Sequence, residues 1–98
     1  MTYDFHPEAL AEYDEAAAHY SACQHGLGLR FIDAVASAIQ HACDSPERAR
    51  KFDGDIRRSL VHVFPYALLY SVEDGFIYII AVMHCAREPG YWKNRIKT

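Results

Sequence analysis

The residues of this sequence best suited to chemistry gather near its end, in the segment HCAREPGYWKNR at residues 84–95. A histidine, an arginine, a tyrosine and a tryptophan directly follow the most apolar run of the chain, residues 76–83. Histidine can act as a general acid or base, and arginine can stabilise an anionic transition state. The same residue types also pack the end of a strand or contact a partner. The segment therefore allows two interpretations, a catalytic cluster at a strand end or a structural and binding tail.

Motifs for metal binding or nucleophilic catalysis are weak. His19 and Cys23 lie four residues apart on a predicted helix, a spacing that can hold zinc, but no second pair with ligand spacing follows. His41 and Cys43 are two residues apart on a helix, so their side chains point in different directions. The sequence has no glycine-rich phosphate loop and no nucleophile elbow. We therefore expect neither a metal nor another cofactor.

The bulk composition indicates one globular domain over residues 1–98. The chain is 51% hydrophobic and 23% charged, with a net charge of −3. Proteins that grip nucleic acid usually carry a basic excess, so this balance argues against that class. The charge is uneven, because residues 1–47 hold one basic and eight acidic residues, whereas residues 48–98 hold nine basic and five acidic ones. The second half can thus form a local basic patch.

The cysteines and the first residues bear on the compartment. The three cysteines are odd in number and lack CxxC spacing, which suits free thiols in a reducing cytosol. Residues 1–15 hold five carboxylates and no lysine or arginine, unlike a signal peptide. The longest apolar run, residues 76–83, is far too short to span a membrane. We expect a soluble, cytoplasmic protein that does not bind membranes.

The first half of the chain predicts a short strand and two helices. Residues 2–5 alternate as an edge strand does, and Pro7 fits the first position of a helix. One apolar stripe follows, made of Leu10, Tyr13, Ala17 and Tyr20. Several polar residues fall largely off that stripe: Glu12, Asp14, Glu15 and His19. A glycine-containing link at residues 24–28 leads to a second helix from about residue 29 to residue 43. One face of that helix carries Ile32, Val35, Ala36, Ile39 and Cys43. Two amphipathic helices with so short a link form an antiparallel hairpin.

The second half of the chain has the period of strands. After a polar loop at residues 47–55, the segment IRRSLVHVF alternates, with Ile56, Leu60 and Phe64 on one face. Pro65 breaks it, and YALLYSV at residues 66–72 is the next strand, followed by the hairpin turn EDG. Residues 76–84 are apolar on both faces, which predicts a central strand covered on both sides. We expect an α+β domain of order β-α-α-β-β-β, a helical hairpin packed on an antiparallel sheet.

That architecture leaves one face of the sheet short of cover. The two helices cover one face, and a chain of 98 residues has little left for the other. An amphipathic helix or a strand from a second protein would fill the gap. The residues therefore predict a protein partner.

The order of elements and several strings resemble the RelE/ParE superfamily of bacterial type II toxins, often called plasmid stabilisation proteins. FHPEALAEYDEAAAHY resembles the opening strand and first helix of the family, GLGLRFIDAVASAI the second helix, and SPER the loop after it. IRRSLVHVFPYALLYSVEDGFIYIIAVMHCAREPGYW resembles the three-strand meander and tail. The resemblance implies a growth-inhibiting toxin that a small antitoxin, ParD-like or RelB-like, neutralises by direct binding. Operator DNA would be bound only through the antitoxin.

Two activities occur on this fold. ParE-like members inhibit DNA gyrase, whereas RelE-like members cleave messenger RNA in the ribosomal A site without a metal. The RelE-like hypothesis implies five candidate site residues in this sequence: Arg57 and Arg58, either of which could be the phosphate-binding arginine, and His84, Arg87 and Tyr91 as an acid, a cation and a stacking tyrosine. Two features depart from the RelE-like pattern, the net acidic charge and the Pro89–Gly90 pair between arginine and tyrosine. We therefore favour a ParE-like, non-enzymatic inhibitor. A decayed toxin that only binds is a third hypothesis.

Partner binding is expected along the basic half of the chain. An acidic antitoxin segment would lie across the following residues: Arg48, Arg50, Lys51, Arg57, Arg58, Tyr91 and Trp92. Each candidate also has a structural interpretation. His84 would bond a backbone group at the strand end, Arg87 would pair with a carboxylate, and the two aromatics would cover the meander.

Overall fold

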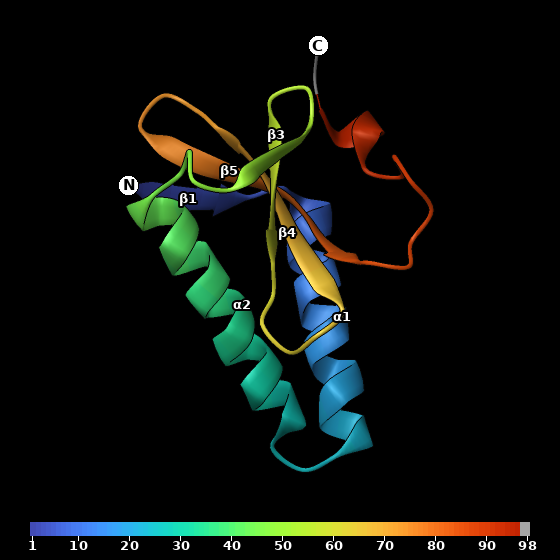
Figure 1. Cartoon of the computed structure of the whole chain (residues 1–98). Helices are drawn as coiled ribbons and strands as arrows, with labels where there is room; N and C mark the ends of the chain where they lie inside the picture. The colour runs from blue at the N-terminus through green and yellow to red at the C-terminus, as the bar shows by residue number, and fades with distance from the viewer. Residues whose placement is uncertain (97–98) are drawn as a thin grey trace.

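Two helices lie against one face of a five-stranded sheet in the computed structural model, which describes residues 1–96 (Figure 1). The helices are α1 (Pro7–Cys23) and α2 (Leu27–Asp44), with a short 3-10 helix η1 (Lys93–Arg95) near the end. The strands are β1 (Thr2–Phe5), β2 (Arg50–Asp53), β3 (Ile56–Leu60), β4 (Tyr66–Val72) and β5 (Phe76–His84). They lie in the order β1-β5-β4-β3-β2. The predicted α+β class and the helical hairpin are confirmed.

The main core fills the space between the helices and the sheet. Phe31 of α2 is fully buried, and its ring centroid lies 5.2 Å from those of Tyr20 and Phe64 and 5.0 Å from that of Tyr66. Further buried residues come from both layers: Ala9, Val35, Leu68, Tyr70, Ile77, Ile79 and Val82. Burial of aromatic and branched side chains is the main favourable term in folding, so this cluster accounts for most of the hydrophobic stabilisation.

The apolar stripes of both helices differ in part from the prediction. On α1 the buried residues are Ala9 and Ala16, whereas Leu10 is 44% exposed. On α2 the buried face includes Phe31, Ala38 and Ala42 besides Val35, Ile39 and Cys43, while Ile32 and Ala36 point to solvent. Alanines thus mark the contact face of α1, whereas on α2 they alternate with large apolar residues such as Phe31 and Val35.

The region expected to be a polar loop contains a strand. β2 pairs antiparallel with β3 around Gly54, whose φ of 57° is the left-handed conformation that such a turn requires. All four residues of β2 are exposed, so no apolar alternation distinguishes them from a loop. Charged side chains on an exposed edge strand also hinder pairing with other chains.

The sheet is mixed, and not antiparallel throughout as predicted. β2, β3, β4 and β5 pair antiparallel, whereas β1 runs parallel to β5, with Thr2 opposite Phe76 and Phe5 opposite Ile79. Parallel neighbours need a long connection, and the helical hairpin between β1 and the meander supplies one. β1 does form an edge of the sheet, as predicted.

Two local irregularities change which face the side chains occupy. β3 ends at Leu60, which is 64% exposed, and Val63 then adopts a φ of 75°, so that Val61 and Phe64 turn toward the helices. The predicted shared face of Ile56, Leu60 and Phe64 is therefore wrong. In β5, Leu69 pairs with Ala81 but Tyr70 pairs with Ile79, so Ile80 is an extra residue.

This bulge reverses the alternation along β5. Ile80, Ala81 and Met83 lie on the face away from the helices, whereas Val82 belongs to the main core. His84 follows Val82 to the helix side, and its ring packs edge-on against Tyr66 at 5.1 Å. Tyr78 and Ile80 therefore lie on the opposite face of the sheet from Val82 and His84.

The second face of the sheet is covered in part by the chain itself. We call residues 85–96 the tail; it turns back after the end of β5 (Figure 1). Trp92 of the tail is 2% exposed and packs against the sheet. The second cluster consists of Trp92 with Ile56, Ala67, Leu69, Ile80, Ala81 and Met83. The expectation that the chain has little left to cover this face is corrected to that extent. Within residues 1–96, neither helix is long and apolar enough to cross a membrane.

Candidate functional site

A carboxylate of α1 joins the helix, the sheet and the tail. Glu12 Oε1 accepts hydrogen bonds from Val82 N at 3.0 Å and from Arg95 Nη1 at 2.9 Å. Glu12 Oε2 accepts from the Tyr91 hydroxyl at 2.7 Å and from Arg95 Nη2 at 2.9 Å. Arg95 Nη1 also donates to the carbonyl oxygen of Ile80 at 3.1 Å. We call Glu12, Val82, Tyr91 and Arg95 the Glu12 cluster.

The Glu12 cluster lies where β5 loses its neighbour. β1 pairs with β5 only as far as Ile79, and His6 N makes the last bond to the Ile79 carbonyl at 2.8 Å before α1 leaves the sheet. Beyond that point the outer edge of β5 has free backbone groups. Glu12 and Arg95 satisfy two of them, the Val82 amide and the Ile80 carbonyl. The cluster thus closes the end of a strand and holds the tail beside it.

The ion pair in this cluster is largely removed from water. The Arg95 side chain is 7% exposed and that of Glu12 is 16% exposed. The two parallel N–H···O bonds form the bidentate arrangement that arginine favours with a carboxylate. The hydrogen bonds with Glu12 raise the pKa of Arg95 further above its usual range. The Arg95 guanidinium therefore keeps its charge at every pH at which the fold is stable.

Tyr91 gives the protein a specific sensitivity to alkali. Burial, and then the hydrogen bond to the Glu12 carboxylate, raise the pKa of Tyr91 well above its usual value of about 10. The folded protein keeps this proton above pH 10, where the unfolded chain releases it, so stability falls as the pH rises through this range. Burial also raises the pKa of other tyrosines: Tyr13, Tyr20, Tyr66 and Tyr70.

The contribution of Tyr91 can be isolated with Tyr91→Phe. We expect the fall in unfolding free energy between pH 10 and 11 to become shallower, by up to about 1.4 kcal/mol per pH unit, the value for one proton. Urea unfolding at pH 9, 10 and 11 measures the two slopes. Equal slopes in the wild-type protein and the variant would contradict a phenol held by Glu12.

The tail has a second attachment at the opposite edge of the sheet. Lys93 Nζ lies 3.1 Å from Asp53 Oδ2, and the Trp92 ring lies 6.3 Å from that of Phe52. Asp53 and Phe52 both belong to β2, the strand that the sequence predicted to be part of a loop. Trp92 is a buried part of the chain's own second cluster. Its contact with a partner stays a prediction.

Three of the five RelE-like candidates share one shallow pocket of about 260 Å³ between α1 and β5. His84, Arg87 and Tyr91 line it together with Glu12, Glu15 and His19. His84 Nδ1 accepts a hydrogen bond from Ala86 N at 3.0 Å. The guanidinium carbon of Arg87 lies 3.8 Å from the Tyr91 ring centroid, and its Nη2 lies 3.5 Å from the carboxylate of Glu88. Two carboxylates therefore stand in the same pocket as the candidate acid and cation.

The two candidate arginines of β3 lie elsewhere. Arg57 Nη1 donates to the carbonyl oxygens of Ala49 at 2.7 Å and Glu47 at 3.0 Å, so it fixes the loop after α2. Arg58 is exposed, and its guanidinium carbon lies 4.9 Å from the Phe52 ring centroid. Neither lines the pocket of His84. The structure thus brings together His84, Arg87 and Tyr91 but not the phosphate-binding arginine of the hypothesis.

The basic residues of the predicted partner-binding segment lie around the start of β2. Arg50 and Lys51 are exposed on this strand, and Lys51 Nζ is 3.5 Å from Asp55 Oδ1. Arg48 precedes the strand and lines a different pocket, at the end of α2. A metal site is not indicated, since no group of three or more potential ligands occurs among residues 1–96.

The comparisons with known proteins identify the family. The sequence model of the family described as "ParE toxin of type II toxin-antitoxin system, parDE" matches residues 3–89. The chain belongs to the ParE toxin family. This match covers β1 through β5 and ends within the tail, before Tyr91 and Arg95. It agrees with the ParE-like assignment made from the sequence strings. No curated protein matches the chain.

A solved structure supports the same fold. One chain of the chromosomal ParDE TA system from P. aeruginosa superposes with a TM-score of 0.72 and 15% sequence identity. The match covers 86% of this chain and 95% of that chain. At this identity the likeness concerns the fold, and the ParE-like α+β architecture is therefore established by shape as well as by sequence.

Two residues of the Glu12 cluster were not predicted as site residues from the sequence, Glu12 and Arg95. Glu12 was placed off the apolar stripe of α1, but it lies three residues after Ala9 and four before Ala16, both of which are buried. That spacing puts all three on one face of the helix. The spacing from the two alanines thus indicated that Glu12 faces the core. The prediction missed it because it followed the large apolar residues of the helix. Arg95 had no comparable signal, because its position depends on how the tail folds back.

Proposed function

We propose that this member of the ParE family is a toxin that acts by binding, with DNA gyrase as its target and without nuclease chemistry. A ParD-like antitoxin neutralises it in the cytoplasm by direct contact, and operator DNA is bound only through that antitoxin. The family match supports a toxin of this class. The protein needs no cofactor for this activity.

The side chains that line the pocket of His84 favour an inhibitor over a nuclease. RNA cleavage would require a phosphate to approach His84 and Arg87, where Glu12 and Glu15 place two carboxylates. The hydroxyl of Tyr91 is already bonded to Glu12, and Arg57 is bonded to two loop carbonyls. Phosphoryl chemistry depends on cations and donors preorganised around the anion. These side chains are committed to holding the fold, which supports an inhibitor.

The test uses expression of the full chain without an antitoxin and two readouts, plasmid topology and cleavage of a translated message. We expect growth arrest with altered DNA topology or DNA damage and intact message. The variants His84→Asn and Arg87→Gln are expected to retain the arrest. Asparagine keeps an acceptor for the amide of Ala86 but cannot transfer a proton as histidine does.

The nuclease hypothesis predicts the opposite result. Its one favourable observation is that His84, Arg87 and Tyr91 do line one pocket. Loss of a general acid or base lowers a rate by about 10²–10⁴-fold, so either variant would abolish arrest while the message is no longer cut. Normal folding of each variant, checked by circular dichroism, separates this outcome from loss of stability. Absence of arrest in the wild-type chain would favour a protein that only binds.

A further inference from the structure

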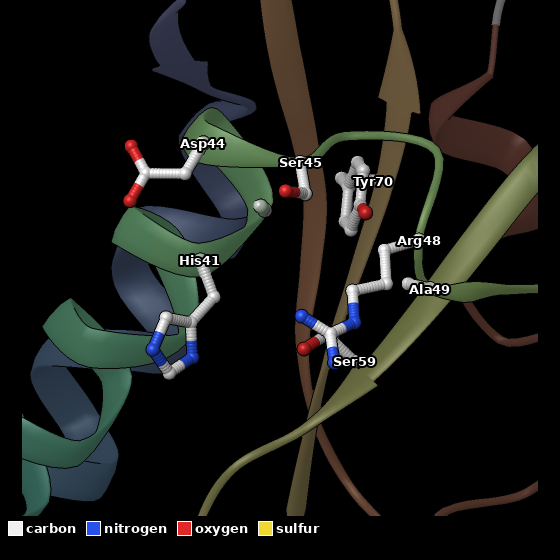
Figure 2. Close-up of a pocket in the computed structure, with 8 residues that line it drawn as sticks. His41, Asp44, Ser45, Arg48, Ala49, Ser59 and Tyr70 are labelled. Carbon is white, nitrogen blue, oxygen red and sulfur yellow. The ribbon is translucent and has the colours of Figure 1, made fainter.

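A second pocket lies on the helix side of the sheet, between the end of α2, the loop at residues 45–49 and β3 (Figure 2). Its volume is about 540 Å³, and its polar lining consists of His41, Asp44, Ser45, Arg48, Ser59 and Tyr70. None of these residues lines the pocket of His84. We call it the α2-end pocket.

The loop that forms its wall is held in place from beneath. Tyr70 is fully buried, and its hydroxyl donates to the carbonyl oxygen of Pro46 at 2.8 Å. Arg57 donates to the carbonyls of Glu47 and Ala49. Three carbonyl oxygens of the loop, those of Pro46, Glu47 and Ala49, thus accept hydrogen bonds from side chains of the sheet. A wall fixed in this way presents its side chains without further ordering when a ligand binds.

The groups that remain in the pocket are mainly donors. Figure 2 shows the guanidinium of Arg48 pointing into the space between α2 and β3, with His41 and Ser59 on the two sides. Among residues 1–96, no ion pair joins Arg48 to a carboxylate. The Asp44 carboxylate accepts from Gln40 Nε2 at 2.9 Å and points away from the cavity. Guanidinium, imidazole and hydroxyl groups facing one space suit an anionic acceptor.

The surroundings favour an anion with a single charge. The pocket lies at the carboxyl end of α2, where the helix dipole is negative, and Asp44 lines its rim. Against these, Arg48 supplies one permanent positive charge. A doubly charged phosphate would meet twice the repulsion with no second cation in the lining. A carboxylate matches the planar fork of one arginine.

We propose that the α2-end pocket receives the carboxylate of an aspartate or glutamate from an acidic segment of the antitoxin. Arg48 binds the carboxylate, while His41 and Ser59 donate to its oxygens. This inference rests on the proposed function for the identity of the partner. Of the basic residues predicted to bind the partner, the proposal makes Arg48 the anchor. Arg50 and Lys51 do not line the α2-end pocket. Such an anchor fixes the register of an extended segment, since a carboxylate one residue away cannot reach the same fork.

The proposal can be tested by NMR titration of the full chain. The probes are a blocked heptapeptide with one central glutamate among alanines and leucines, the same peptide with glutamine, and inorganic phosphate. We expect the glutamate peptide to shift the amide signals of residues 41–49 and Ser59. Arg48→Gln should reduce the initial slope of these shifts about tenfold, as expected for loss of a charged hydrogen bond. Arg50→Gln, an exposed arginine of β2, is the matched control and should leave the slope unchanged.

Each other result overturns the assignment. Equal shifts with the glutamine peptide would show that the pocket does not recognise a carboxylate. Stronger shifts with phosphate would show that its ligand is a phosphate. Equal losses in Arg48→Gln and Arg50→Gln would reduce the pocket to a diffuse basic patch. No shift with any probe would leave no anion site. The titration needs no antitoxin, so its failure leaves the proposed function intact. Cleavage of the message on expression would overturn the proposed function, but it would not affect the assignment of an anion site in the α2-end pocket.

Discussion

Replacement of Glu12 by glutamine is expected to lower the free energy of unfolding by about 3–5 kcal/mol. Glutamine keeps the size of the side chain and an oxygen for the amide of Val82, but it removes the buried counter-charge of the Arg95 guanidinium and leaves only the exposed carboxylate of Glu8 near it. Chemical denaturation at pH 7 measures the loss. Trp92 is the single tryptophan of the chain, so its fluorescence reports whether the tail detaches.

Glu8→Gln is the matched control for this prediction. Glu8 lies one turn earlier on α1 and is 3.7 Å from Arg95 Nε, but its side chain is 62% exposed. Exposed ion pairs contribute about 0–1 kcal/mol, so this variant should be nearly as stable as the wild-type protein. Similar losses for both glutamates would mean that burial does not strengthen the Glu12 pair.

A double variant separates the charge from the contact. Glu12→Gln combined with Arg95→Met removes both charges and retains bulk in the same space. Because an unpaired buried charge is what makes the single variant costly, the double variant should recover much of the lost stability. If it is no better than Glu12→Gln alone, the hydrogen bond between the Tyr91 hydroxyl and the carboxylate carries the stabilisation, and not the ion pair with Arg95.

The parts of the fold that the sequence predicted well are those with a long, regular apolar period. Both helices and the strands β4 and β5 repeat apolar residues over several turns or pairs, and all four elements form where expected. β2 was missed because its residues Arg50–Asp53 are all exposed, and the pairing with β3 stabilises it through backbone bonds alone. The parallel direction of β1 was missed for a related reason, since a strand of four residues carries no signal for its neighbour.

The candidate site was predictable in composition but not in arrangement. His84, Arg87 and Tyr91 were chosen as neighbours in sequence, and they do line one pocket. Their partners were not predictable, because the bulge at Ile80 decides which way His84 faces, and a bulge leaves no mark in an apolar strand. Glu12 and Arg95 are more than eighty residues apart, and only the return of the tail brings them together.

The segment at residues 84–95 makes structural contacts with the rest of the fold. Tyr91 bonds to α1, Trp92 fills the second cluster, and Arg95 closes the free edge of β5. The segment that resembled a catalytic cluster is attached to the fold at two edges of the sheet, through Glu12 on one side and Asp53 on the other. A protein with so few residues gains the cover for its second sheet face from its own tail, which reduces the apolar surface that a partner must bury.

The second large effect is expected at Trp92. Trp92→Ala should lower the free energy of unfolding by about 3–5 kcal/mol, the range for deleting a buried aromatic side chain. It also exposes Ile56, Leu69 and Met83, which the indole covers. Urea unfolding followed by circular dichroism measures the loss, because the variant has no tryptophan. Leu60→Ala is the control, since Leu60 is exposed and its truncation should change stability by no more than about 0.5 kcal/mol.

Trp92→Phe distinguishes the cover provided by the ring from any role of the indole nitrogen. Trp92 Nε1 is buried and has no hydrogen-bond partner among residues 1–96. An unpaired buried donor is itself unfavourable, so phenylalanine loses volume but also removes this defect, and it should cost about 1 kcal/mol. A loss as large as that of alanine would show that the nitrogen has an acceptor when the protein is in solution. If neither variant is less stable than Leu60→Ala, the tail does not hold the second face, and a partner must cover it, as the apolar strand alone had predicted.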